Sequence, residues 1–194
     1  MIGSYLLPIS SPPVLTLTQF LQTLFVGITG LPGDLVRPKW QIEPPKQPDV
    51  MVDWIGIGID IIRPDANGYL WSNPLDTTGT SATYDRMEAI EVGVAIYGPN
   101  SIETYGYLRD GFEIPQNRFA MDGQRLGFVE IGPGLRIPEL IDERFYNRVQ
   151  TTVYLQREIR RTYSIPTLIS AGGKIYTDTY ANAAQYLVNW KTNN

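Results

Sequence analysis

The run from Asn147 to Tyr163 constrains the fold more than any other part of the chain. Its apolar and small side chains recur at every second position, which is the period of a β-strand with one buried face. They are Val149, Thr151, Val153, Leu155 and Ile159. At about 3.3 Å per residue the run extends about 55 Å, far beyond the usual strand of about five or six residues. A strand of this length must bend or project past its own domain.

Two earlier stretches, Met51–Ile62 and Tyr84–Tyr97, also predict strands. The first places Gly56 and Gly58 on one face, and Ile61 on the other face together with Ile55 and Ile57. The second has one apolar face and one shallow face. The apolar face holds Ile90, Val92, Val94 and Ile96, and the shallow face holds Ala89, Gly93 and Ala95. We expect a helix to pack closely on the shallow face.

Helical spacing occurs in two places. Residues 17–28 repeat apolar side chains on one face, and Gly30 provides a stop. A second helix follows Asn100 and ends before Pro115, with Ile102, Tyr105, Leu108 and Phe112 along one side. Residues 116–121 suggest a short helical turn. The predicted fold class is α+β: a twisted, mainly antiparallel sheet with two packed helices and a proline-rich extended arm.

The chain of 194 residues contains no histidine and no cysteine. Disulfides, thiolate metal sites, cysteine nucleophiles and serine–histidine pairs are therefore excluded within it. Gly56-Ile57-Gly58 lacks the third glycine of a dinucleotide fingerprint. The acidic pairs Asp142–Glu143 and Glu88–Glu91 are interpreted as solvated surface charges. We expect no catalytic residue, no cofactor and no metal, and therefore no enzyme.

Charge and hydropathy exclude two further classes of function. The net charge is -4 and no basic stripe is present, unlike in electrostatic nucleic-acid binders. No apolar stretch approaches the roughly 20 residues that span a bilayer, and the N-terminal residues form a poor signal peptide. The composition is typical of a soluble intracellular protein without membrane association.

The segment from Gly30 to Trp54 is rich in proline. Because proline fixes φ and lacks a backbone donor, Pro38, Pro44, Pro45 and Pro48 cannot sit inside a helix or a central strand. The composition predicts a stiff arm with polyproline character. Such an arm can cover its own sheet, as an ordered loop held by Trp40, or reach a neighbouring molecule.

Three stretches, taken in order, carry a family resemblance. The first is Leu31-Pro32-Gly33 with Val36 to Gln41 and Glu43 to Asp49. The second joins Tyr107 to Gly111 with Ile114 to Arg118, and the third leads from Arg136 to Leu140 into Arg157 to Tyr163. Together they span about residues 16 to 178 and resemble the neck (tail) terminator proteins of tailed bacteriophages.

This resemblance implies a structural virion protein of the neck, found in the host cytoplasm during assembly. It implies one domain, 1–194, with 1–13 and 181–194 as interaction or flexible ends. The expected assembly is a closed ring of six copies that terminates the tail tube and joins the tail to the head–neck connector. The expected partners are the tail tube protein, a connector or adaptor protein, the sheath, and genomic DNA that passes through the lumen without specific binding.

We expect the arm and the long strand to supply the subunit interface. The interface residues are predicted to be Trp40, Pro44, Pro45, Pro48, Arg157 and Arg161, and the arginines to face interfaces or the outer surface rather than the lumen. An alternative of another class is a β-rich carbohydrate-binding or polysaccharide-active protein. In that protein Trp40, Trp54 and Trp71 would be stacking platforms.

Overall fold

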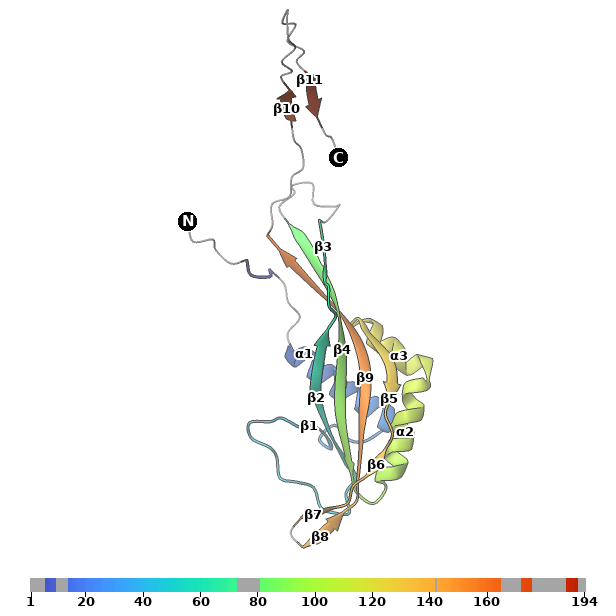
Figure 1. The fold of residues 1–194 in the computed structure, drawn as a ribbon. Coiled ribbons are helices and arrows are strands. Elements are labelled where there is room, and N and C mark those ends of the chain that lie inside the picture. Colours follow the sequence, from blue (N-terminus) through green and yellow to red (C-terminus); the bar gives the residue numbers. More distant parts are fainter. Residues whose placement is uncertain are drawn as a thin grey trace, which may run out of the picture. The chain divides into compact units, whose positions relative to one another are not determined.

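The fold is built on a sheet, as the alternating run predicts. The computed structural model describes residues 6–9, 14–72, 81–141, 143–164, 172–175 and 188–191. Among these, seven strands form one mixed, mostly antiparallel sheet with the order β1-β2-β4-β9-β5, while β3 pairs with β4 and β6 with β9 (Figure 1). Their bounds are β1 Val36–Pro38, β2 Trp54–Pro64, β3 Tyr69–Ser72, β4 Ala82–Tyr97, β5 Leu126–Ile131, β6 Leu135–Arg136 and β9 Arg148–Tyr163.

Contacts divide the chain into two compact units. One comprises Pro12–Gly68 and Asp85–Ile159, and the other comprises Met1–Ser11, Tyr69–Tyr84 and Arg160–Asn194. The first unit holds most of the sheet and the helices. In the second unit β10 (Gly172–Ile175) pairs antiparallel with β11 (Val188–Lys191). The expectation of one domain spanning 1–194 is not tested by this division and stays a prediction.

The long strand is confirmed. β9 covers Arg148–Tyr163, and along most of it buried positions alternate with more exposed ones. The strands also contain register shifts, between Ile59 and Ile61 in β2 and between Phe128 and Glu130 in β5. Such bulges bend a strand and change the face on which later side chains lie. Ile61, predicted on the same face as Ile57, is therefore 38% exposed.

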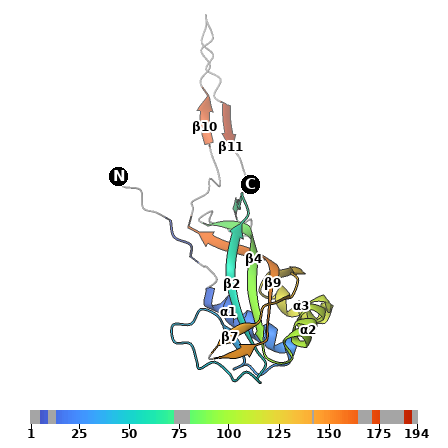
Figure 2. The same cartoon turned by 60° about the horizontal axis from the view of Figure 1, so that its bottom comes forward.

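Three helices pack on the sheet instead of the two predicted: α1 (Val14–Thr29), α2 (Ser101–Glu113) and α3 (Pro115–Asp122). The expected helical turn at 116–121 is thus a full helix, in which Pro115 occupies the first turn. α1 ends at Gly30, whose φ of 71° is the left-handed conformation that glycine favours. Figures 1 and 2 show α1 behind the strands of the sheet. None of the described helices is long and apolar enough to cross a membrane.

The helices lie on the apolar face of the sheet, not on the shallow face as expected. One buried cluster joins the β4 side chains Val92, Val94 and Ile96 to Phe25 of α1 and Phe112 of α2. The reason is area: branched side chains remove far more apolar surface from water than glycine and alanine can. The shallow face is therefore left for another part of the chain.

α2 also turns a different side to the core than the one predicted. Leu108 and Phe112 are buried as expected, but Ile102 is 58% exposed, and small residues such as Ser101 and Gly111 are buried in its place. A β-carbon at Gly111 would overlap the side chain of Ile28 in α1. The small residues allow the two helices to approach closely.

The outer side of the edge strand β1 is closed by side chains. The Gln22 side-chain amide donates to the carbonyl of Val36 at 2.8 Å, and that of Gln41 donates to the carbonyl of Pro38 at 3.1 Å. β1 itself is parallel to β2 and pairs with it from Val36 to Pro38.

Candidate docking groove

The shallow face of β2 and β4 is covered by the segment between β1 and β2, residues 39–53, which we call the proline loop. Residues 40–49 of this loop have no helix or strand. Loop and sheet enclose a groove of about 510 Å³, within the usual range for binding pockets. The loop contributes Lys39, Trp40, Gln41, Pro44, Pro45 and Gln47, and the sheet contributes Arg37, Pro38, Trp54, Gly56, Asp60, Ala95, Tyr97 and Arg148.

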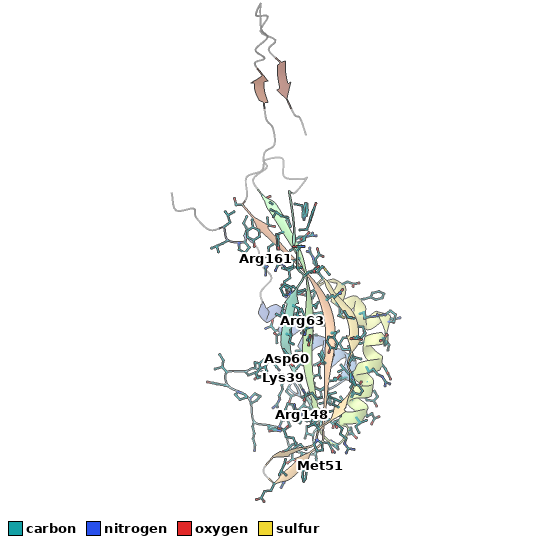
Figure 3. All side chains as sticks on the ribbon, in the orientation of Figure 1. Lys39, Met51, Asp60, Arg63, Arg148 and Arg161 are labelled. Carbon is teal, nitrogen blue, oxygen red and sulfur yellow. The ribbon has the colours of Figure 1, made fainter. Side chains whose placement is uncertain are left out.

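Glycines let the loop lie directly on the sheet. A β-carbon at Gly58 would lie 3.0 Å from Lys39 Cδ and 3.1 Å from Trp40 Nε1. At Gly93, the cross-strand partner of Gly58, it would overlap the Asp60 carboxylate. The Lys39 ammonium bridges to that carboxylate at 3.4 Å (Figure 3). The sequence thus uses the shallow face to seat the proline loop rather than a helix.

Hydrogen bonds hold the base of the loop. The Lys39 backbone N–H donates to the carbonyl of Ile57 at 2.7 Å. Arg37 donates from Nη1 to the carbonyl of Lys46 at 2.8 Å and from Nε to that of Asp34 at 2.7 Å. Arg37 therefore fixes the loop through neutral acceptors, the backbone carbonyls of Asp34 and Lys46.

One end of the groove is built from four stacked side chains, which we call the aromatic ladder. Trp54 and Tyr97 are cross-strand partners, and their rings stack with centroids 4.2 Å apart and planes 4° from parallel. The Arg37 guanidinium lies 5.9 Å from the centroid of Trp54, and the Arg148 guanidinium lies 5.5 Å from that of Tyr97. Such cation–π contacts contribute on the order of 0.5–1 kcal/mol each at exposed sites.

The groove is basic although the chain is acidic. Arg37, Lys39 and Arg148 line it, whereas its carboxylate lining comes from Asp60. Arg148 pairs with Glu139 at 3.0 Å, and the Tyr97 hydroxyl donates to the same carboxylate at 3.5 Å. Burial raises the pKa of Tyr97; the charge of Arg148 opposes this shift and Glu139 adds to it. The phenol is therefore neutral near neutral pH.

Two buried donors of the ladder have no hydrogen-bond acceptor among the described residues. They are Trp54 Nε1 and Arg148 Nε. A buried donor without an acceptor costs about 1–3 kcal/mol, so such groups are few in native proteins.

The predicted interface residues fall into two groups. Trp40, Pro44 and Pro45 line the groove, and Trp40 is 78% exposed, while Pro48 is half-buried in the same loop outside the lining. Arg157 is only 8% exposed in β9, opposite Leu126 of β5. Arg161 is half-buried and belongs to the other compact unit.

Sequence reasoning missed the ladder and Arg148. It treated Trp54 only as a platform for sugars, but its ring is already stacked on Tyr97. Trp71, in the other unit, has the Arg160 guanidinium 5.9 Å from its ring centroid. A usable signal existed: Gly58 pairs with Gly93 in only one antiparallel register, and that register places Trp54 opposite Tyr97.

The described residues contain no group of three or more acidic side chains arranged to hold a metal ion. In comparisons with known proteins, the profile of the family described as phage neck terminator protein matches residues 15–179. Comparison with curated proteins gave no match.

Proposed function

Because the chain belongs to the phage neck terminator proteins, structural proteins of the bacteriophage virion, we propose that it forms a closed ring at the end of the tail. The ring terminates the tail tube and joins the tail to the head–neck connector. Six copies match a six-fold tail. Closure of a ring from identical subunits requires two different, complementary surfaces on each copy.

The exposed proline loop is the observation that carries this proposal. Trp40 is 78% exposed and Ile42 is fully exposed, yet the base of the loop is fixed by hydrogen bonds. Large apolar side chains presented on an anchored segment are typical of a surface that binds another protein. Proline-rich backbone also loses little entropy when it docks.

We therefore keep the predicted interface as a proposal. Trp40, Pro44, Pro45 and Pro48 form a stiff arm, seated at its base on its own sheet, whose exposed side meets the neighbouring subunit. Arg157 and Arg161 remain proposed interface residues as well. Because Arg157 is 8% exposed, it offers a neighbour little area, and the arm supplies the larger share of the contact.

The proposed partners are the tail tube protein, the connector or an adaptor protein, and the sheath where the tail has one. Genomic DNA passes through the lumen without specific binding, so the wall of the channel is acidic or neutral. The net charge of -4 per chain, repeated around a ring, supports a wall that repels phosphate. This role needs surfaces and no catalysis, in the neck of the virion and, during assembly, in the host cytoplasm.

Electron micrographs of the purified protein, with and without isolated tail tubes, test this proposal together with the mass in solution. The expected result is a ring, in solution or on the ends of the tubes. A monomer that leaves tube ends bare contradicts the proposal. If that monomer instead binds polysaccharide, the carbohydrate-binding alternative is favoured.

A further inference from the structure

A small hairpin, like the proline loop, exposes large apolar side chains. β7 (Glu139–Ile141) pairs antiparallel with β8 (Arg144–Tyr146). Leu140 and Phe145 lie directly opposite each other in this pair, so their side chains share one face. They are 60% and 72% exposed. An exposed apolar pair of this kind marks a surface that binds another molecule.

The turn of this hairpin carries an exposed carboxylate. Glu143 is exposed and has φ of 62°, and the exposed Arg144 follows it at the start of β8. The hairpin thus combines exposed apolar side chains with the carboxylate of Glu143 at its tip.

The proline-loop groove has the complementary chemistry. Trp40, Pro44 and Pro45 supply apolar walls, while Arg37, Lys39 and Arg148 supply positive charge; among the described residues, Asp60 supplies the carboxylate of the lining. Arg37 carries the least compensated of these charges, because it donates to backbone carbonyls, whereas Lys39 and Arg148 pair with carboxylates. Opposite charges on two facing surfaces favour encounter and fix the register of docking.

We propose that the β7–β8 hairpin of one copy docks in the proline-loop groove of the next copy around the ring. Phe145 packs against Trp40 and the prolines, and the carboxylate of Glu143 approaches Arg37. A second copy is the favoured occupant because both surfaces belong to the same chain and match in charge and apolarity. Two different patches of one chain make the heterologous contact that a closed ring requires. This inference rests on the proposed ring and names the segments that join its subunits.

Disulfide crosslinking tests the contact, and the absence of native cysteine makes every crosslink assignable. The double variant Gln47→Cys/Phe145→Cys places one thiol in the groove lining and one on the hairpin; both positions are exposed, so the fold is not disturbed. Mild oxidation should give a series of covalent oligomers on denaturing gels. A control double variant, Gln47→Cys/Phe119→Cys, carries the second thiol on the exposed side of α3 instead and should give no covalent oligomers.

The outcomes separate this inference from the proposed function. Three results overturn the hairpin contact and leave the ring standing, provided that the mass of the ring is unchanged. They are the absence of crosslinked oligomers, disulfides within single chains only, and equal amounts of crosslinked oligomers in both double variants. Wild-type protein that stays monomeric with and without tail tubes overturns both. As a second measurement, Glu143→Arg should weaken ring formation at low salt at least tenfold. Glu130→Arg, at an exposed position of β5, should not weaken it.

Discussion

Gly93 lies directly beneath the carboxylate of Asp60, so closely that a β-carbon at residue 93 would overlap it. The same β-carbon would lie 2.6 Å from Lys39 Nζ. The position of the proline loop on the sheet therefore depends on the absence of a side chain in the neighbouring strand.

Replacing Gly93 with alanine should lower the free energy of unfolding by about 1–3 kcal/mol, the usual cost of overpacking. The Lys39–Asp60 ion pair must move, and Trp40 moves with it. Urea denaturation measures the loss. Gly127→Ala is the matched control, because a β-carbon there meets nothing within 4 Å on its strand. Equal stability of the two variants would show that the loop does not rest on Gly93.

Replacing Trp40 with alanine should weaken assembly while the circular dichroism spectrum is almost unchanged. The side chain is 78% exposed in the single chain, so its apolar area is available to a neighbour. Loss of an aromatic anchor of this kind costs about 2 kcal/mol or more, about thirtyfold in a dissociation constant. Sedimentation at several concentrations measures it, with Phe119→Ala as the control. If the monomer unfolds instead, Trp40 serves its own core and the interface assignment is wrong.

The Phe112 ring should be essential to the fold. It lies 5.7 Å from Phe25 in an edge-to-face contact and 5.0 Å from Phe128 in a stacked one, both measured between ring centroids. Phe112→Ala should therefore cost about 3–5 kcal/mol of stability. Phe119→Ala, on an exposed side chain of α3, should change stability by less than about 0.5 kcal/mol. Denaturation of both variants by urea makes the comparison, and similar midpoints would contradict the described core.

Stability should fall at alkaline pH, in part through Tyr97. Burial raises its pKa above the ordinary value of 10.0. The unfolded chain therefore releases this proton first, so the stabilisation is complete below about pH 10 and is lost as pH rises through the folded pKa. Glu139→Gln should lower the Tyr97 pKa, because that carboxylate adds to the shift. Ultraviolet titration of the phenols, with Tyr97→Phe to identify the signal, measures this change. An unchanged titration in Glu139→Gln would show that Glu139 does not act on Tyr97.

The assembled protein should bind duplex DNA weakly, even at low salt. Each phosphate contact would add a slope of about -0.9 to the dependence of log affinity on log salt. Filter binding between low and physiological salt measures this slope. Tight, salt-sensitive binding by the ring would refute a repelling channel wall. A channel lined by Arg157, Arg160 and Arg161 would refute the proposed placement of these arginines.

Local patterns predicted the elements, and pairing between distant segments decided the rest. The long strand β9 and the stop of α1 at Gly30 follow from spacing within a few residues. The face that the helices cover was predicted wrongly, because the small residues of β4 were taken to favour a helix although the branched side chains on its other face bury more apolar area. The groove was not predicted, because its lining residues Trp40 and Tyr97 are brought to one site by the pairing of β2 with β4, which the Gly58–Gly93 pair indicated but local patterns did not.

The closed edge at β1 has a consequence for the behaviour of the subunit before it is assembled. Because alternate residues of a strand turn to opposite neighbours, the Val36 and Pro38 carbonyls point away from β2, and both accept a glutamine amide. Pro38 has no N–H to offer. A passing strand of another chain finds few free groups to pair with at this side, so copies made in excess should not stick together there through their backbones. Binding at this side therefore depends on side chains, whose contacts are specific to one partner.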